Sequence, residues 1–107
     1  MVKKHFERNR DYYRRKQAEQ RKATKQRFSQ IIREGKQKPC TDCDRQFDSC
    51  AMDYDHVRGR KLFNVGCGVT SGGSEARLLV EIAKCEVVCA VCHRLRTHAR
   101  RQKNKLP

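Results

Sequence analysis

The sequence has little with which to build a large hydrophobic core. It contains no tryptophan, aromatic residues make up only 7% of it, and hydrophobic residues of all kinds make up 36% of its 107 residues. Small domains with so little apolar material are usually stabilised by disulfides or by a metal ion. No apolar run reaches the length of a membrane-spanning helix, and the first residues lack the apolar stretch of a signal peptide. We therefore expect a cytoplasmic protein with reduced cysteines and no membrane contact.

Acidic residues are also scarce. The chain has 12 Asp and Glu against 26 Lys and Arg, which gives a net charge of +14 and points to a polyanionic partner, above all nucleic acid. Residues 1–38 contain 14 of the basic residues but only 4 of the acidic ones. The charge distribution therefore separates a basic N-terminal arm, residues 1–35, from a domain that contains the cysteines, residues 36–107.

Proline and glycine are absent between residues 3 and 34. This segment consists mainly of Lys, Arg, Gln, Glu and Ala, which are good helix formers, so we predict one long basic helix. Only Phe28, Ile31 and Ile32 have the spacing of a face that packs on another element. Two interpretations of the remaining charge stay open: a helix that is simply solvated, or an arm that binds DNA.

Two pairs of cysteines carry the strongest chemical signal. Cys40 and Cys43 form one Cys-x-x-Cys pair, Cys89 and Cys92 form a second, and 45 residues separate them. Each pair lets one tight turn present two thiolates to one ion, and two turns complete the tetrahedral shell of a structural zinc site. The total of seven cysteines is odd, which argues against a closed disulfide framework.

The segment between the cysteine pairs contains an Asp-His dipeptide in a predicted strand, residues 50–56. Alternation along that strand places Asp53 and Asp55 on one face and Tyr54 and His56 on the other. Asp55 and His56 reach the same site only if the strand ends there.

A loop with basic residues follows over residues 57–73, with glycines at positions 66, 68, 72 and 73 in its second half. We expect hydrophobic side chains at positions 63 and 65 to hold it to the core. Ser74 has the chemistry of a helix N-cap, and Leu78, Leu79, Ile82 and Ala83 form an apolar stripe that we expect to be buried. A second strand over residues 85–88 and a basic helix over residues 93–103 complete the domain.

Three segments together resemble the zinc-containing HNH endonucleases of phages and bacteria. They are Cys40-x-x-Cys43, the dipeptide Asp55-His56, and the run from Glu81 to Thr97 that contains Cys-Ala-Val-Cys-His. The resemblance covers residues 39–101. It implies an α+β fold with a small ββα-metal domain that is stabilised by a four-cysteine zinc site. In this chain the long basic helix precedes that domain. It also implies hydrolysis of DNA phosphodiester bonds in a bacterial cell or phage-infected host.

The chemistry of phosphodiester hydrolysis assigns roles within this pattern. His56 is the candidate general base, because a histidine of ordinary pKa is largely neutral at cellular pH. Asp55 and His93 are candidate ligands of a catalytic divalent cation, magnesium or manganese, with nickel or zinc also compatible with an imidazole. Basic side chains near these residues are candidate DNA contacts: Arg58, Arg60, Lys61, Arg94, Arg96, Arg100 and Arg101.

A non-catalytic alternative remains open. Lys84 and Val91 stand where similar HNH sequences carry asparagine. A zinc-stapled basic protein that only binds DNA, or a protein partner in phage DNA packaging or assembly, fits the same composition. A redox role for the Cys-x-x-Cys pairs fits less well, since it leaves the interposed Asp55 and His56 unexplained.

Overall fold

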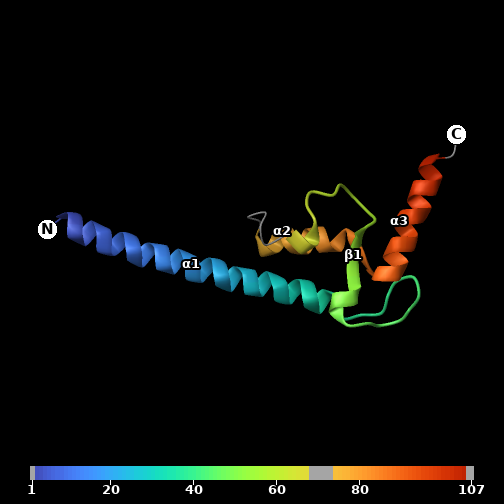
Figure 1. The fold of residues 1–107 in the computed structure, drawn as a ribbon, viewed down its shortest axis with the longest axis horizontal. Helices are drawn as coiled ribbons and strands as arrows, with labels where there is room; N and C mark the ends of the chain where they lie inside the picture. Colours follow the sequence, from blue (N-terminus) through green and yellow to red (C-terminus); the bar gives the residue numbers. More distant parts are fainter. Residues whose placement is uncertain (1, 68–73, 106–107) are drawn as a thin grey trace.

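The computed structural model describes the backbone of residues 2–67 and 74–105 and the side chains of residues 9–66 and 74–105. Within these residues the chain forms an α+β fold with three α-helices and one two-stranded sheet (Figure 1), and its longest dimension is 73 Å. Residues 68–73 of the predicted glycine loop lie outside the described residues. The elements in chain order are α1 (Val2–Gly35), the 3-10 turn η1 (Ser49–Ala51), β1 (Met52–His56), the 3-10 turn η2 (Val65–Cys67), α2 (Glu75–Ala83), β2 (Cys85–Cys89) and α3 (Ala90–Lys105).

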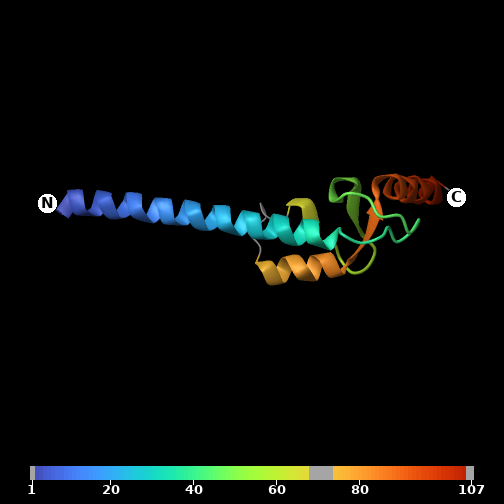
Figure 2. The same ribbon diagram turned by 90° about the horizontal axis from the view of Figure 1, so that it is seen from below.

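The long predicted helix is present as α1, and its last turns pack on the domain as expected. Phe28 is only 4% exposed and belongs to a cluster with Val65 and Leu78, against which Ile31 and Ile32 also pack. Figure 2 shows α2 running beside this end of α1. From Asn9 to Arg27 the side chains of α1 are exposed, so the helix projects from the domain with its charges in solvent.

A tyrosine from the sheet fixes the end of α1. The Tyr54 hydroxyl donates a hydrogen bond to the carbonyl oxygen of Ile32 at 2.8 Å. A Cβ at Gly35 would lie 2.0 Å from that same hydroxyl oxygen, so only glycine permits this close approach. Burial raises the pKa of Tyr54 to about 12, which keeps the hydroxyl protonated as a donor.

The two strands pair antiparallel, with Met52 opposite Cys89 and His56 opposite Cys85. The predicted alternation of β1 is confirmed by its contacts. Asp53 and Asp55 meet side chains of α3, whereas Tyr54 and His56 meet α1 and α2 on the other face. Because β1 ends at His56, residues from both faces come close to one another at the end of the sheet.

Helix α2 buries fewer apolar side chains than its sequence indicates. Ser74 caps it as predicted, accepting a hydrogen bond from the Arg77 backbone N–H at 3.2 Å, and Leu78 is 1% exposed. Leu79, however, is 50% exposed and Ala83 is exposed, so the prediction that they belong to the core was wrong. A small sheet and the end of α1 cover only a narrow side of α2, and the position buried one turn after Leu78 is Glu81, not an apolar residue.

Candidate functional site

The four cysteines of the two pairs come together as the sequence predicts. The Sγ atoms of Cys40, Cys43, Cys89 and Cys92 all lie within 4.8 Å of one another. Cys89 ends β2, Cys92 lies in the first turn of α3, and the first pair lies in the turn that precedes β1. Four thiolates at this separation match the donor set of a tetrahedral zinc ion, so the residues present fit a structural metal.

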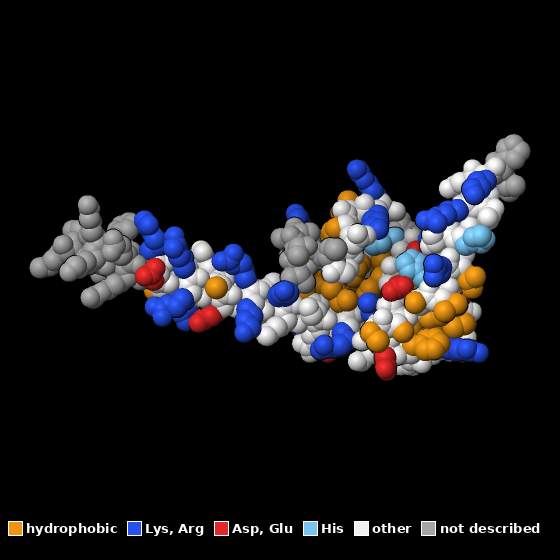
Figure 3. Space-filling model, viewed as in Figure 1, with side chains coloured by type: hydrophobic (Ala, Val, Ile, Leu, Met, Phe, Trp, Pro, Cys, Tyr) orange, Lys and Arg blue, Asp and Glu red, His pale blue; other side chains and the backbone are white. Residues whose placement is uncertain are grey.

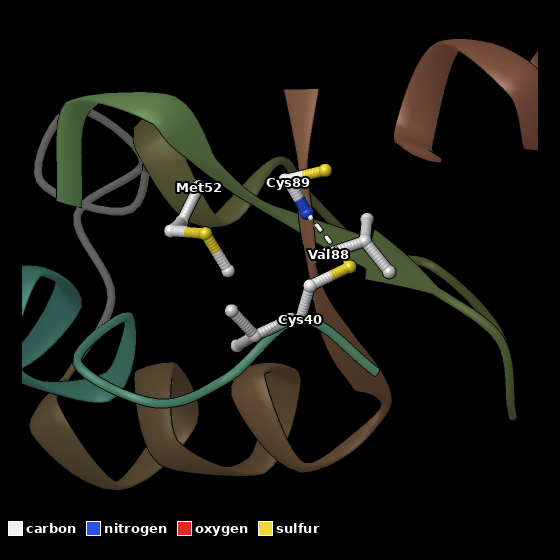
Figure 4. Packing of buried hydrophobic residues seen from close by; sticks show 5 residues of the cluster. Cys40, Met52, Val88 and Cys89 are labelled. Carbon is white, nitrogen blue, oxygen red and sulfur yellow. Dashed lines mark hydrogen bonds between the residues drawn. The ribbon is translucent and has the colours of Figure 1, made fainter. Parts of the chain in front are cut away.

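Local hydrogen bonds fix the first cysteine turn against β2. The backbone N–H and the hydroxyl of Thr41 both donate to the carbonyl oxygen of Val87, at 3.0 and 2.9 Å. Asp44, with a φ of 61°, adopts the left-handed conformation that closes the turn. Figure 4 shows Cys40 and Cys89 against Met52 and Val88, both fully buried.

The surroundings of Cys40 favour the ionised form of its thiol. Burial raises its pKa, but hydrogen bonds from the backbone N–H groups of Cys43, Cys89 and Asp42 outweigh burial and lower the pKa to about 6. Of these donors, Cys89 N lies 3.2 Å from the sulfur. Since a metal binds thiolates, these backbone dipoles reduce the cost of assembling the centre.

An open cleft of about 580 Å³ lies beside the end of the sheet. It brings together the three residues assigned to catalysis from the sequence: Asp55 and His56 from β1 and His93 from α3. Figure 3 shows histidine and carboxylate side chains gathered in the middle of this face, between α2 and α3. The full lining is Lys36, Asp53, Tyr54, Asp55, His56, Lys61, Asn64, Val65, Gly66, His93 and Arg100.

His93 is oriented by a carboxylate that sequence reasoning left without a role. Its Nδ1 lies 2.9 Å from Asp53 Oδ2, and its Nε2 lies 3.7 Å from Asp55 Oδ1. A ligating histidine commonly has its second nitrogen held by a carboxylate in this way. Alternation along β1 places Asp53 beside Asp55, and this is the signal that could have identified it.

Asp55 is buried and is neutralised by two arginines of α3. Arg100 forms a bidentate pair with it, at 2.9 and 2.7 Å, and Arg96 donates a third hydrogen bond at 2.9 Å. The guanidinium of Arg100, assisted by that of Arg96, lowers the pKa of Asp55 to about 2 although burial opposes the shift. Asp55 is therefore ionised and already balanced by positive charge.

His56 meets a buried carboxylate to which the sequence assigned no role of its own. Its Nε2 lies 2.9 Å from Oε2 of Glu81, which is 1% exposed. The Glu81 carboxylate also accepts hydrogen bonds from Lys84 Nζ at 3.0 Å and from the Leu62 backbone N–H at 3.2 Å. No apolar periodicity could have revealed Glu81, because hydropathy alone predicts that a glutamate faces solvent.

The basic residues assigned to DNA fall into two groups. Arg96 is occupied by three carboxylates, Asp42, Asp55 and Glu86, and Arg58 donates to the carbonyl oxygen of Ala83, so both guanidiniums stabilise the domain in this arrangement. Arg96 is thus paired within the domain, and its assignment as a DNA contact stays a prediction. Arg60, Lys61, Arg94, Arg100 and Arg101 are exposed, as is the side chain of Arg58, and Arg100 is at the same time paired with Asp55.

Lys36 is a cleft residue that the sequence pattern placed in a linker. It lines the cleft, and its ammonium lies 5.7 Å from the centre of the Tyr54 ring. With Lys61 and Arg100 it places positive charge around the acidic and imidazole groups. No sequence pattern indicated this, because Lys36 reaches the cleft only through the packing of the end of α1 against the sheet.

Fewer side chains are placed to bind a second cation than are placed to bind zinc. Within the described residues, the four cysteines are the only group of three or more metal-ligating side chains that converge. His93 Nε2 and Asp55 Oδ1 are close enough to share one ion if Arg100 turns away, and Arg100 has an exposed side chain that can do so. Two protein ligands suit a cation such as magnesium, which keeps several of its waters.

Comparison with known proteins gives no match to this chain, either among family models, among curated proteins or among solved structures. Among the described residues, no helix combines the length and the apolar character needed to cross a membrane.

Proposed function

We propose that this protein is a metal-dependent endonuclease of the HNH type that hydrolyses phosphodiester bonds in DNA. The observation that carries the proposal is the convergence of Asp55, His56 and His93, from two elements, on one open cleft. A four-cysteine centre close to the start of α3 supports it, because the centre fixes Cys92 and hence the adjacent His93. The net charge of +14 provides attraction for the substrate.

The residues of the cleft have complementary tasks in this proposal. His56 takes the proton from the attacking water, and Asp53 orients His93 through its Nδ1. When bound at Asp55 and His93, a divalent cation would stabilise charge on the phosphate and on the leaving 3′ oxygen. Lys36 and Lys61 contact the flanking phosphates, and the exposed basic residues of α1 and α3 hold the DNA on either side.

A non-catalytic nucleic-acid-binding protein is the second candidate. The pairing of Asp55 with Arg96 and Arg100 favours it, since both positive charges must share or release this carboxylate before a metal uses it. In that case the four-cysteine centre and the basic helices serve binding alone.

Nicking of supercoiled plasmid by the zinc-loaded protein, with magnesium, manganese or nickel added, distinguishes the two. His56→Ala is expected to lower the cleavage rate by about 10²- to 10⁴-fold with little change in DNA affinity. His98→Ala is the matched control, because His98 is exposed on α3 and does not line the cleft. If the wild type nicks DNA with none of these metals, or if His56→Ala and His98→Ala cleave at equal rates, His56 is not a catalytic general base.

A further inference from the structure

Glu81 is the most unusual side chain in the domain. It is a charged residue with 1% exposure, few of the described residues are buried as deeply, and it lies on α2 one turn after the buried Leu78. Burying an ionised carboxylate is costly unless its oxygens are fully hydrogen-bonded. An apolar side chain would fill this position without that cost. The buried carboxylate therefore indicates a role other than stabilising the fold.

The Glu81 carboxylate is held as an anion. Burial raises its pKa, but hydrogen bonds from Lys84, from the Leu62 backbone and from His56 outweigh burial and lower the pKa. An ionised carboxylate only accepts hydrogen bonds, so the proton in the 2.9 Å contact belongs to His56 Nε2. In the neutral imidazole the lone pair is then on Nδ1, the nitrogen for which no described residue supplies a hydrogen bond.

Lys84 holds Glu81 and the loop after β1 in one arrangement. Its ammonium donates to Glu81 Oε1 at 3.0 Å and to the Arg60 carbonyl oxygen at 2.8 Å. Its own carbonyl oxygen accepts from the backbone N–H groups of Val57 and Arg58. Gly59, with a φ of 69°, brings the loop against the methylenes of the lysine. Lys84 therefore holds the loop directly and the His56 imidazole through Glu81.

We infer that Glu81, braced by Lys84, is a positioning residue that fixes His56 in the Nε2–H tautomer and directs the Nδ1 lone pair to the cleft. This deepens the proposed function and rests on it for the role of His56 in proton abstraction. The tautomer itself is a property of the folded protein, so it can be measured whether or not the protein cleaves DNA.

The test combines imidazole ¹⁵N NMR with cleavage kinetics on the full-length, zinc-loaded chain, in wild type, Glu81→Gln and Glu81→Ala. Glu81→Gln keeps the size and an accepting oxygen, which protects against loss of folding. Glu75→Gln is the control, because Glu75 lies on the same helix with an exposed side chain.

We expect one Nε2–H tautomer for His56 in the wild type and in Glu75→Gln, and a mixture of tautomers in Glu81→Ala. The kcat of nicking should fall by about 10- to 100-fold in Glu81→Ala with KM for DNA nearly unchanged, and Glu81→Gln should recover part of the loss. An Nδ1–H tautomer in the wild type, or tautomers and kcat unchanged in both Glu81 variants, overturns the inference. A wild type that shows the expected tautomer but never nicks DNA overturns the nuclease proposal and the catalytic part of this one, and leaves Glu81 as a structural anchor.

Discussion

Asp53 Oδ2 accepts a hydrogen bond from the imidazole of His93 at 2.9 Å, across 40 residues of sequence. The contact joins the second residue of β1 to the first turn of α3 and turns the second nitrogen of His93 toward Asp55. A histidine held in this way has one orientation and one donor nitrogen. The consequences for metal binding can be measured directly.

Asp53→Asn is expected to raise the concentration of magnesium or manganese needed for half-maximal cleavage by about 10- to 100-fold, because His93 loses its charged orienting partner. The rate at saturating metal should change less. Titration of the metal in a nicking assay measures both quantities. Asp48→Asn is the control, since Asp48 is exposed outside the cleft, and an equal metal requirement in both variants would contradict the role of Asp53.

One zinc ion per chain is expected at the four cysteines, and its removal should unfold residues 36–107, since the core around Met52 and Val88 is small. Elemental analysis gives the stoichiometry, and circular dichroism during chelation follows the unfolding. Cys43→Ser should weaken zinc binding, whereas Cys50→Ser should not, although both thiols are exposed. Zinc-free protein that keeps its fold would contradict this prediction.

Removal of residues 2–24 should weaken DNA binding and flatten its dependence on salt. Each phosphate that the shortened protein no longer neutralises should reduce the slope of log K against log salt by about 0.9. The truncation leaves Phe28 and its cluster intact, so the free energy of unfolding should change little. Binding measured at several salt concentrations decides between a DNA-binding arm and a solvated helix. Unchanged affinity and slope would identify the solvated helix.

Truncation through residue 34 should behave differently. It removes Phe28, Ile31 and Ile32, which cover Val65 and Leu78, and loss of a buried phenylalanine alone typically costs about 3–5 kcal/mol. We expect a clearly lower Tm for this variant than for the one lacking residues 2–24. Equal Tm values would mean that α1 does not contribute to the stability of the domain.

Arg96→Ala is expected to lower the free energy of unfolding by about 2–3 kcal/mol, because it leaves three carboxylates with fewer donors around a mostly buried guanidinium. Arg101→Ala, on the exposed side of the same helix, should change it by less than about 0.5 kcal/mol. Urea denaturation of the zinc-loaded proteins measures the difference. Equal stabilities would contradict a stabilising role for the ion pairs of Arg96.

Local features of the sequence determined much of this protein. The absence of proline and glycine defined α1, alternation placed Asp53 and Asp55 on one face of β1, and the spacing of the cysteines specified their cluster. These features could be predicted from the sequence because helix propensity, strand alternation and tight turns depend on residues only a few positions apart.

Only the tertiary structure decided how the side chains of the cleft are paired. The pairing of His56 with Glu81 joins residues 25 positions apart, and that of Arg96 with Asp42 joins residues 54 apart. Both depend on the register of two strands and on the way α2 and α3 pack against them, which no local pattern encodes. The sequence by itself therefore specified which chemical groups the protein contains. Packing determined that Glu81 is buried against His56, whereas Leu79, two residues earlier, is 50% exposed.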